Sequence, residues 1–354
     1  MPLARLRIKA LRCLTELELE LGPERNVIYG PNGAGKTSIL EGIFLLGRGR
    51  SFRTRQIRKL VRRGEEGFSV YGEVLLGDRR RRLGVAYVEG HLDKRIDGEP
   101  AGGTAALAEL LPVHVIDPGL HDLIQGGPSE RRRFLDWGVF HVEPNYLPAW
   151  KRYRRHLSQR NAGLKGAIPP AELGAWTQGL IEAGEVVHEA RKAYVRSLEK
   201  LVAGHGRTLL DRTLTVEYLQ GWRADLPLQQ ALAASESRDR FVGATEVGPH
   251  RADLAVRLDG VRVSEEASRG QQKLAAAALI LAQAELHART QSDRGLLLVD
   301  DPAAELDERS LDRLMLALEQ VPTQRVVTAL SPRHLPAPPG FAVFHVEHGA
   351  LRAV

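Results

Sequence analysis

The most informative segment of this chain is Gly30-Pro31-Asn32-Gly33-Ala34-Gly35-Lys36-Thr37. It fits the pattern Gly-x-x-x-x-Gly-Lys-Ser/Thr, whose glycines let successive backbone N–H groups turn inward around a phosphate. Apolar residues at 26–29 predict a buried strand before the segment, and residues 36–46 predict a helix after it, whose N-terminus favours anions. This context favours a phosphate-binding loop over a tight turn that merely contains Lys and Thr.

The loop predicts specific contacts to ATP. Lys36 is expected to reach the β- and γ-phosphates and to act in catalysis, and the Thr37 hydroxyl is expected to ligate Mg²⁺. The residues expected to contact ATP are Gly30, Pro31, Asn32, Gly33, Ala34, Gly35, Lys36, Thr37 and Ser38.

A second motif is Leu296-Leu297-Leu298-Val299-Asp300-Asp301, an apolar strand that ends in two carboxylates. Such a pair alone is common, but together with a phosphate loop it indicates a Walker B motif. Asp300 is then expected to hold Mg²⁺, and Asp301 is expected to accept a proton from the attacking water as the catalytic base.

A third motif, Ser268-Arg269-Gly270-Gln271-Gln272, begins a predicted helix over 270–288. It resembles the signature of ABC-type ATPases, where a serine hydroxyl, a glycine N–H and a helix N-terminus form an anion site. In that architecture the signature closes on the nucleotide of a second copy. Residues 304–307 resemble the D-loop of the same interface, with Asp307 as its acidic residue. ABC transporters usually place Glu at the position of Asp301, so the shorter side chain suggests slow hydrolysis, unless the backbone compensates.

Hydrophobic periodicity predicts an α/β fold. Alternating residues in 5–10 and 16–21 predict an antiparallel hairpin with basic and acidic outer faces, and further strands are expected at 68–76, 83–88, 113–116, 214–219 and 252–258. The segment 78–82, which contains four arginines, is expected to form a basic turn between the strands 68–76 and 83–88. We predict an ABC-type P-loop ATPase head, with a mixed sheet and an antiparallel subdomain, built from residues 1–117 and 212–354.

Residues 118–211 are expected to form an inserted arm. Apolar positions at heptad spacing, with Arg160 in one of the same register slots, predict two antiparallel helices joined by the loop 165–170. This would be a stub of a coiled coil, although the spacing also fits an ordinary amphipathic helical subdomain. The seam positions are Tyr146, Trp150, Tyr153, Leu157, Leu164, Leu173, Trp176, Leu180, Ala183, Val187, Ala190, Tyr194 and Leu198.

These motifs, in this order, resemble the bacterial RecF family of DNA replication and repair ATPases. Further segments that carry the resemblance are Arg12, Leu40-Glu41-Gly42, Gly49-Arg50-Ser51-Phe52-Arg53-Thr54, Pro128-x-x-Arg131-Arg132-Arg133-Phe134-Leu135-Asp136 and Gly248-Pro249-His250-Arg251. The resemblance spans nearly the whole chain. It implies an SMC-like head that dimerises on ATP, binds DNA at gaps or junctions and hydrolyses ATP slowly. It also implies RecO and RecR partners, and a role in recombinase loading during DNA repair, replication restart and the SOS response to DNA damage.

The chain departs from the expected pattern at a few positions. No acidic residue follows Arg251, and Ala304 stands where the D-loop has serine. Thr328, after a predicted strand at 325–327, is expected to occupy the place of the ABC switch histidine. His334 lies beyond a proline and is expected in a loop.

Basic clusters suggest contact with the DNA backbone without base reading. The residues assigned to this contact are Arg50, Arg53, Arg55, Arg58, Lys59, Arg62 and Arg63. The alternative is a solvated face. Arg79–Arg82 and Arg131–Arg133 form two further groups, and the latter could instead pair with local carboxylates.

Composition agrees with a basic cytoplasmic protein associated with the nucleoid. The 354 residues carry a net charge of +6, a single cysteine and no apolar run long enough for a membrane helix. The alternative function is the ATPase subunit of an ABC transporter. Against it stand the arm, the high pI and the absence of an obvious switch histidine.

Overall fold

The computed structural model describes residues 3–166, 170–291, 295–331, 333, 335 and 342–352. The chain forms two compact units. We call Met1–Leu120 together with Ala277–Val354 the head unit, and His121–Ala276 the arm unit. The chain passes between them in η2 (Pro118–His121) and α9 (Arg269–Thr290).

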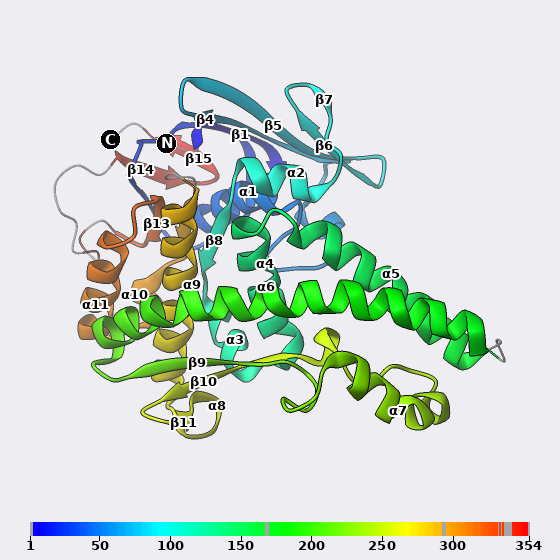
Figure 1. The fold of residues 1–354 in the computed structure, drawn as a ribbon. Coiled ribbons are helices and arrows are strands. Elements are labelled where there is room, and N and C mark those ends of the chain that lie inside the picture. The colour runs from blue at the N-terminus through cyan, green and yellow to red at the C-terminus, as the bar shows by residue number, and fades with distance from the viewer. Residues whose placement is uncertain are drawn as a thin grey trace. The chain divides into compact units, whose positions relative to one another are not determined.

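An antiparallel sheet of six strands forms one layer of the head unit, in the order β2-β1-β4-β5-β6-β7 (Figure 1). Its strands are β1 (Leu3–Leu11), β2 (Leu14–Glu20), β4 (Phe68–Leu76), β5 (Arg79–Val88), β6 (His91–Ile96) and β7 (Glu99–Pro100). The register of β1 and β2 pairs Arg7 with Glu18 and Lys9 with Glu16, so the predicted charged hairpin is confirmed. Leu6 and Ile8 point into the core.

The basic residues 79–82 lie in β5, so the prediction of a basic turn there is wrong. The turn is limited to Gly77 and Asp78. Arg80 pairs with Glu73 on β4, and Arg81 pairs with Asp97 beyond β6. These cross-strand ion pairs let an arginine run continue as a strand.

The second sheet of the head unit has the order β15-β14-β3-β13-β12-β8. Its strands are β3 (Arg25–Tyr29), β8 (Val113–Ile116), β12 (Leu296–Val299), β13 (Gln324–Ala329), β14 (Ala342–Glu347) and β15 (Ala350–Arg352). All neighbours pair in parallel except β14 with β15. The predicted strands before the phosphate loop and before Asp300 therefore end at the same edge of one sheet, with β13 between them.

Helix α1 (Lys36–Arg48) packs on strands of both sheets, and its apolar residues fill the core between them. The remaining helical segments of the head unit are η1 (Ile57–Leu60), α2 (Thr104–Leu110), α10 (Pro302–Glu305) and α11 (Glu308–Glu319).

The arm unit combines helices with a small antiparallel sheet. The helical segments are α3 (Asp122–Gln125), α4 (Pro128–Val142), α5 (Tyr146–Lys165), α6 (Pro170–Leu210), α7 (Leu228–Val242), η3 (Pro249–Arg251) and α8 (Val263–Glu266). The sheet has the order β11-β10-β9, from β9 (Leu214–Leu219), β10 (Asp253–Leu258) and β11 (Val261–Arg262).

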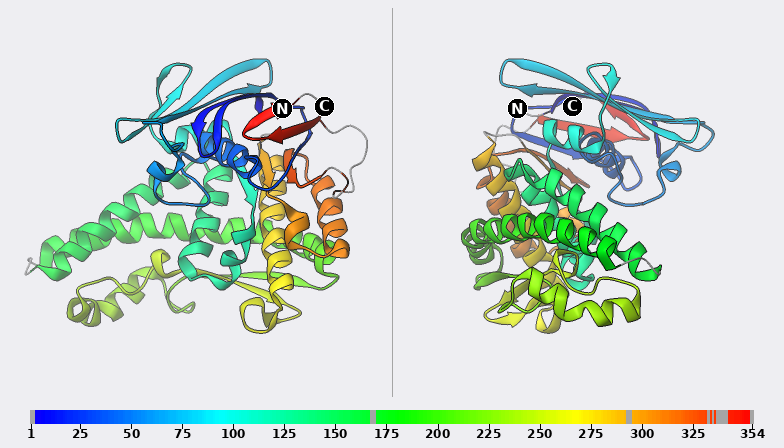
Figure 2. Two further views of the ribbon diagram at one scale, coloured as in Figure 1. Left: turned by 180° about the vertical axis from the view of Figure 1, so that it is seen from behind. Right: turned by 45° about the vertical axis from the view of Figure 1, so that its right-hand side comes forward.

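Helices α5 and α6 lie side by side, as the heptad spacing predicts (Figure 2). Tyr153 and Leu157 of α5 and Leu180 and Val187 of α6 are buried. The pair is more than a bare coiled-coil stub, because α7 packs against both helices. Of the predicted loop 165–170, residues 167–169 lie outside the described part of the chain.

The division into units differs from the one expected from sequence. We expected the arm to span residues 118–211 and the head to resume at 212, whereas residues 212–276 group with the arm helices. The physical reason is that β9 packs on α6 and β10 on α4, so this segment completes the core of the arm unit. The signature residues Ser268–Gln271 consequently belong to the arm unit.

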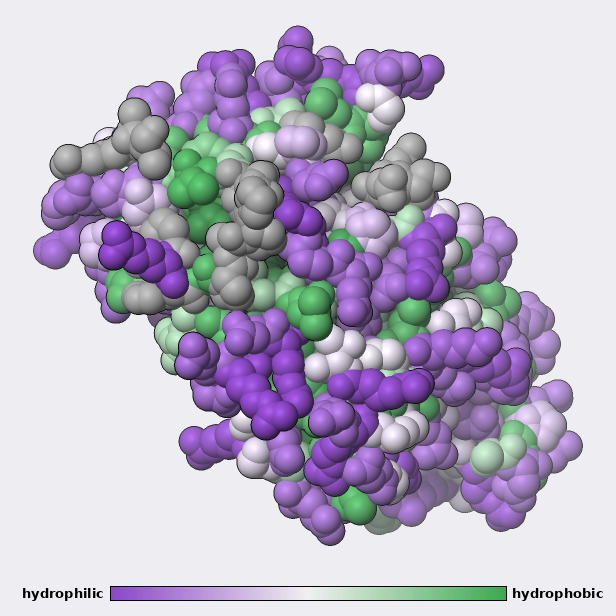
Figure 3. Space-filling view, turned by 90° about the vertical axis from the view of Figure 1, so that its left-hand side faces the viewer, coloured by the Kyte–Doolittle hydropathy of each residue, from purple (hydrophilic) through white to green (hydrophobic). Residues whose placement is uncertain are grey.

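On the face shown in Figure 3, hydrophobic residues stand in small groups between hydrophilic ones. Within the described ranges, no helix is both long and apolar enough to span a bilayer.

Candidate nucleotide-binding site

The phosphate loop follows β3 and requires glycine at particular positions. Gly33 has φ +78° and open space on the side where a Cβ would point, so its backbone conformation alone favours glycine. Gly35 has φ +114°, and a Cβ there would lie 2.6 Å from Cδ2 of Leu14. The turn between β1 and β2 therefore packs directly against the loop.

The Lys36 ammonium folds back onto the loop. It donates to the carbonyl oxygens of Gly30 at 2.7 Å and of Pro31 at 3.2 Å. Burial lowers the pKa of Lys36, and the nearby charges of Asp301 and Asp300 oppose that shift. A phosphate held in the loop would meet a cation that the loop already orients.

Asp300, which directly follows β12, is hydrogen-bonded to the start of α1 and to β13. Its Oδ1 accepts hydrogen bonds from Thr37 Oγ1 and from Thr328 Oγ1, both at 2.9 Å. Desolvation raises the pKa of the Asp300 carboxyl, while the two hydroxyl donors lower it. The sequence-predicted pair Thr37 and Asp300 is thus brought into contact.

This pair fits a Mg²⁺ ion. In an octahedral site with Mg–O distances of about 2.1 Å, adjacent ligand oxygens lie about 3 Å apart. Thr37 Oγ1 and Asp300 Oδ1 have that separation. Mg²⁺ usually takes few protein ligands and completes its shell with phosphates and water.

Asp301 has a strained backbone at the start of α10. Its φ of 44° lies in the left-handed region, which Asp tolerates better than most residues. Its N–H donates to Thr328 Oγ1 at 2.9 Å. Thr328 therefore contacts both carboxylate residues, at the place where we expected the switch residue. His334 lies outside the described part of the chain.

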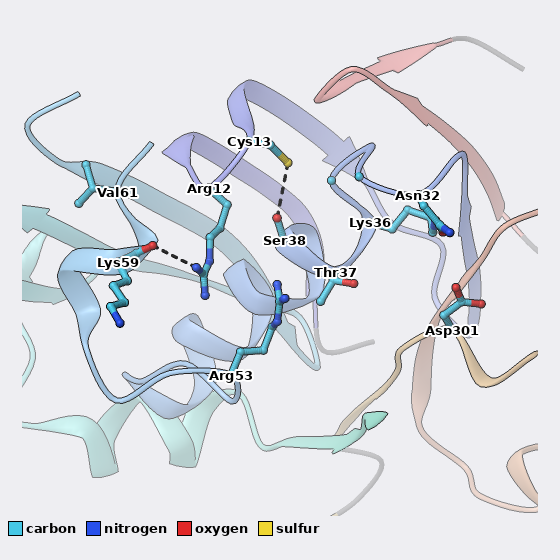
Figure 4. Close-up of a pocket in the computed structure, with 12 residues that line it drawn as sticks. Arg12, Cys13, Asn32, Lys36, Thr37, Ser38, Arg53, Lys59, Val61 and Asp301 are labelled. Carbon is cyan, nitrogen blue, oxygen red and sulfur yellow. Dashed lines mark hydrogen bonds between the residues drawn. The ribbon is translucent and has the colours of Figure 1, made fainter. Parts of the chain in front are cut away.

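A pocket of about 580 Å³ opens beside the loop (Figure 4). Its side chains come from the loop, from Asp301 and from the segment after α1, which contributes Arg53 and Lys59. The lining residues are Arg12, Cys13, Asn32, Gly33, Gly35, Lys36, Thr37, Ser38, Arg53, Lys59, Val61 and Asp301. Two residues that we assigned to DNA contact, Arg53 and Lys59, thus line the nucleotide pocket.

The remaining residues of the Arg50–Arg63 cluster are on the surface. Arg50, Arg55, Arg58 and Arg63 are exposed, and Arg62 is half-buried near Glu65. In the arm unit, by contrast, Arg131 forms a two-point ion pair with Asp253, so the alternative of local pairing is correct for this arginine.

A buried glutamate organises the pocket wall. Glu41 on α1 is fully buried and accepts from Arg12 Nε at 2.8 Å and Nη2 at 3.0 Å, and also from the hydroxyl of Ser51. Arg12 Nη1 in turn donates to the carbonyl of Lys59. Sequence reasoning missed this role. The available signal was a lone acidic residue on the apolar helix over 36–46.

The expected dimer residues lie at helix ends. Gln271 N–H donates to Ser268 Oγ, and Ser268 N–H donates to Gln271 Oε1, a reciprocal cap at the start of α9 with Arg269 and Gly270 between them. Asp307 caps α11 by accepting from the N–H and hydroxyl of Ser310, and these bonds lower its pKa.

Comparison with known proteins identifies the family. The family model described as the RecF/RecN/SMC N terminal domain matches residues 2–349. The DNA replication and repair protein RecF of Pseudomonas paraeruginosa is 40% identical over 99% of this chain and 97% of its own length. The RecF protein of Azotobacter vinelandii is 41% identical, over 99% and 98%. The chain belongs to the RecF family.

Solved structures agree with RecF-family membership. The recombination mediator protein RecF of the RecFOR pathway, solved as RecF-ATP, superposes with a TM-score of 0.88 at 26% identity, over all of this chain and 97% of that one. An Smc head domain from Pyrococcus furiosus, at 14% identity over 100% of this chain and 96% of that one, has a TM-score of 0.63 and shows the shared fold alone. The ABC/SMC-type head predicted from the motifs is confirmed, and the transporter alternative has no support in a RecF-family chain.

Proposed function

We propose that this protein is an ATP-dependent, DNA-binding repair ATPase that dimerises on ATP at gapped or junction DNA and assists recombinase loading. The observation that carries the ATPase part is the 2.9 Å hydrogen bond between Thr37 Oγ1 and Asp300 Oδ1 beside a phosphate loop with its lysine in place. Family membership and the ATP-bound RecF structure support the same conclusion.

In this proposal the residues have distinct tasks. The loop N–H groups and Lys36 bind the phosphates, and Thr37 and Asp300 would hold Mg²⁺, which neutralises charge on the β- and γ-phosphates. Asp301 orients the attacking water and accepts its proton. Arg53 and Lys59, which line the pocket, add positive charge near the bound nucleotide.

Dimerisation would complete the site. The Ser268 hydroxyl and the first N–H groups of α9 form an exposed helix N-terminus suited to an anion, and we assign it to the nucleotide of a second copy. Asp307 is assigned to the same interface. Because the Ser268 hydroxyl already accepts from Gln271 N–H, it is oriented before a partner arrives.

The partners follow from the family. The relatives are DNA replication and repair proteins, and the solved RecF is a recombination mediator of the RecFOR pathway. We propose RecO- and RecR-type mediators and gapped duplex DNA as partners, with the exposed arginines of 50–63 contacting phosphates. A cytoplasmic, nucleoid-associated location follows from the same reasoning.

The decisive experiment measures ATP hydrolysis by the purified protein with and without gapped duplex DNA. We expect the wild type to hydrolyse ATP slowly and DNA to stimulate that hydrolysis. We expect the Lys36→Ala variant neither to bind ATP tightly nor to hydrolyse it. The matched control is Lys9→Ala, which removes an exposed lysine on β1. Hydrolysis that DNA does not change would argue against the repair function, and unchanged ATP affinity in Lys36→Ala would argue against the nucleotide site.

Dimerisation has its own test. Ser268→Arg places a bulky cation where the second nucleotide would dock, so we expect ATP binding without an ATP-dependent dimer in sedimentation. Arg309→Ala, a change of an exposed residue on α11, serves as the control. A Ser268→Arg variant that still dimerises with ATP and Mg²⁺ contradicts the composite site.

A further inference from the structure

Helix α5 of the arm unit is unusually basic. Its sequence, Tyr146–Lys165, contains six Lys and Arg residues and no Asp or Glu. Arg160 is the only one of the six that is buried, where it pairs with Asp239. The other five are exposed and are Lys151, Arg152, Arg154, Arg155 and Lys165.

These five side chains form no ion pair within the described ranges. Most other arginines of the arm unit do, such as Arg131 with Asp253 and Arg191 with Asp136. Two acidic residues of neighbouring α6 have partners on their own helix, since Glu182 accepts from Gln178 and Glu189 lies near Lys192, and none of the acidic residues of α6 forms an ion pair with these five cations within the described ranges. The positive charge of α5 is therefore left for a partner outside the chain.

Three of the five exposed charges share the outer face of the helix, and Arg152 and Arg154 flank it on opposite sides. At 100° per residue, Lys151, Arg155 and Lys165 lie opposite the buried positions Tyr153 and Leu157. From 151 to 165 the helix rises about 21 Å at 1.5 Å per residue, which matches about six base pairs of duplex at 3.4 Å each. Figure 2 shows α5 extending along the arm unit beside α6.

The composition of the face favours DNA over an acidic protein. Protein interfaces are centred on large apolar or aromatic anchors. The exposed residues of α5 other than the five cations are Pro148, Ser158 and Ala162, which provide none. Trp150 is only half-buried, and the guanidinium of Arg154 covers its ring at 5.5 Å. A row of cations without apolar anchors suits a phosphate backbone.

We propose that the outer face of α5, defined by Lys151, Arg152, Arg154, Arg155 and Lys165, binds the phosphate backbone of duplex DNA. This deepens the proposed function and rests on its DNA partner, but it adds a contact separate from the Arg50–Arg63 cluster. None of the five residues lines the nucleotide pocket. The contact therefore persists without ATP and does not depend on base sequence.

The test uses the full-length protein and a 20-base-pair duplex, with binding measured by anisotropy at several salt concentrations in the absence of nucleotide. The test variant is Lys151→Gln/Arg155→Gln/Lys165→Gln, which removes the three cations at the centre of the outer face. Each lost phosphate contact lowers the slope of log K against log salt by about 0.9, so three contacts lower it by about 2.7. Between 50 and 200 mM salt, the wild type then loses about 40-fold more affinity than the variant does.

The matched control is Arg223→Gln/Arg240→Gln/Arg257→Gln. It removes the same charge from three arginines of the arm unit, of which Arg223 and Arg240 are exposed and Arg257 is half-buried, and which pair with Asp225, Glu236 and Glu217. We expect its slope to equal that of the wild type, and the ATPase rate without DNA to be unchanged in both variants. Thermal melting establishes that both variants are folded, since the substituted side chains lie outside the core.

The outcomes are distinct. A normal slope in the test variant, or an equal drop in the control, overturns the α5 contact while leaving the proposed function intact. Displacement of the duplex by polyglutamate at equal charge would indicate an acidic protein partner and overturns the assignment to DNA. A wild-type protein that binds no DNA, with or without ATP, overturns the proposed function itself.

Discussion

The hydroxyl of Thr37 lies 2.9 Å from Oδ1 of Asp300, although 263 positions of sequence separate the two residues. The contact exists because β3 and β12 are both parallel to β13 and end at one edge of the sheet. It places a buried carboxylate where Mg²⁺ would bind. The buried charge of this carboxylate therefore lowers the stability of the metal-free protein, and a bound cation would offset that cost.

Asp300→Asn is expected to raise the melting temperature of the metal-free protein at pH 7. Burial raises the pKa of Asp300 in the folded state, so the wild type loses stability as the pH rises through that pKa. Asn removes the charge and keeps an oxygen for both threonines. The same variant should lose the stabilisation by Mg²⁺-ATP in differential scanning fluorimetry. Asp312→Asn, at an exposed position on α11, should change little, and an Asp300→Asn variant that melts below the wild type would contradict the interpretation.

Asp301→Asn is expected to bind ATP and dimerise but to hydrolyse about 10²–10⁴-fold more slowly, the usual worth of general-base assistance. Asn is the appropriate change because, like Asp, it tolerates the left-handed backbone at this position. Single-turnover hydrolysis measures the effect, with Glu305→Gln as the control nearby on α10. Wild-type turnover in Asp301→Asn would show that another group activates the water.

Glu41→Ala is expected to weaken ATP binding without changing a residue of the pocket. Loss of the charged hydrogen bonds to Arg12 should cost about 1.5–3 kcal/mol of folding free energy, and it frees the segment that carries Arg53 and Lys59. Calorimetric titration of ATP measures the affinity. Glu18→Ala, which removes an exposed partner of Arg5 and Arg7, is the control. Full affinity for ATP in Glu41→Ala would mean that the pocket wall holds without the glutamate.

His250 is expected to make stability depend on pH. Its Nδ1 lies 2.6 Å from Tyr153 Oη and its Nε2 lies 2.9 Å from the Thr245 carbonyl oxygen, and burial lowers its pKa from 6.5 to about 4. The unfolded state therefore binds more protons between pH 6.5 and pH 4, and the free energy of unfolding falls by about 3 kcal/mol as the pH drops through that window.

Urea denaturation between pH 7 and pH 4 measures this dependence. His250→Gln should reduce the number of protons taken up on unfolding by up to one, which flattens the dependence of the free energy of unfolding on pH. His91→Gln, at an exposed position on β6, should leave that dependence unchanged. Burial also lowers the pKa values of His114 and His188, so part of the dependence remains in either variant. Identical slopes in His250→Gln and the wild type would exclude His250 as a source.

Arg160→Met is expected to destabilise the protein by about 3–5 kcal/mol, because it leaves the buried charge of Asp239 without its partner. Arg160 Nη1 lies 2.8 Å from Asp239 Oδ2, and both residues are buried. Arg160→Met/Asp239→Asn should recover more than half of the loss, since Asn keeps an acceptor for the Glu246 N–H. Arg240→Ala, which removes an exposed ion pair, should cost less than about 1 kcal/mol. A double variant no more stable than the single one would refute the charge-burial argument.

Sequence reasoning succeeded where the signal is local. Strands β9 and β12 have the predicted bounds, and the phosphate loop lies between a strand and a helix as expected. Spacing within a short segment determines such elements, because the backbone periodicity and the glycine conformations depend on near neighbours.

Sequence reasoning failed where a distant partner decides the outcome. The arginines of β5 looked like a turn because Glu73 and Asp97, which pair with them, belong to other segments. Sequence reasoning did not place Arg53 beside the phosphate loop, because the course of its segment depends on the Glu41 and Ser51 contacts. Arg160 fits the helix seam, but its role depends on Asp239 of α7, which heptad spacing cannot reveal.

Thr328 gives the site a property that a histidine could not. Its hydroxyl accepts from the N–H of Asp301 and donates to the carboxylate of Asp300, so one small side chain joins the residue that we propose binds the metal to the one that we propose activates the water. A histidine at this place would change its charge between about pH 5 and pH 8. A threonine hydroxyl does not titrate in this range, so the hydrogen bonds that join the two carboxylate residues gain no charge of their own as the pH changes.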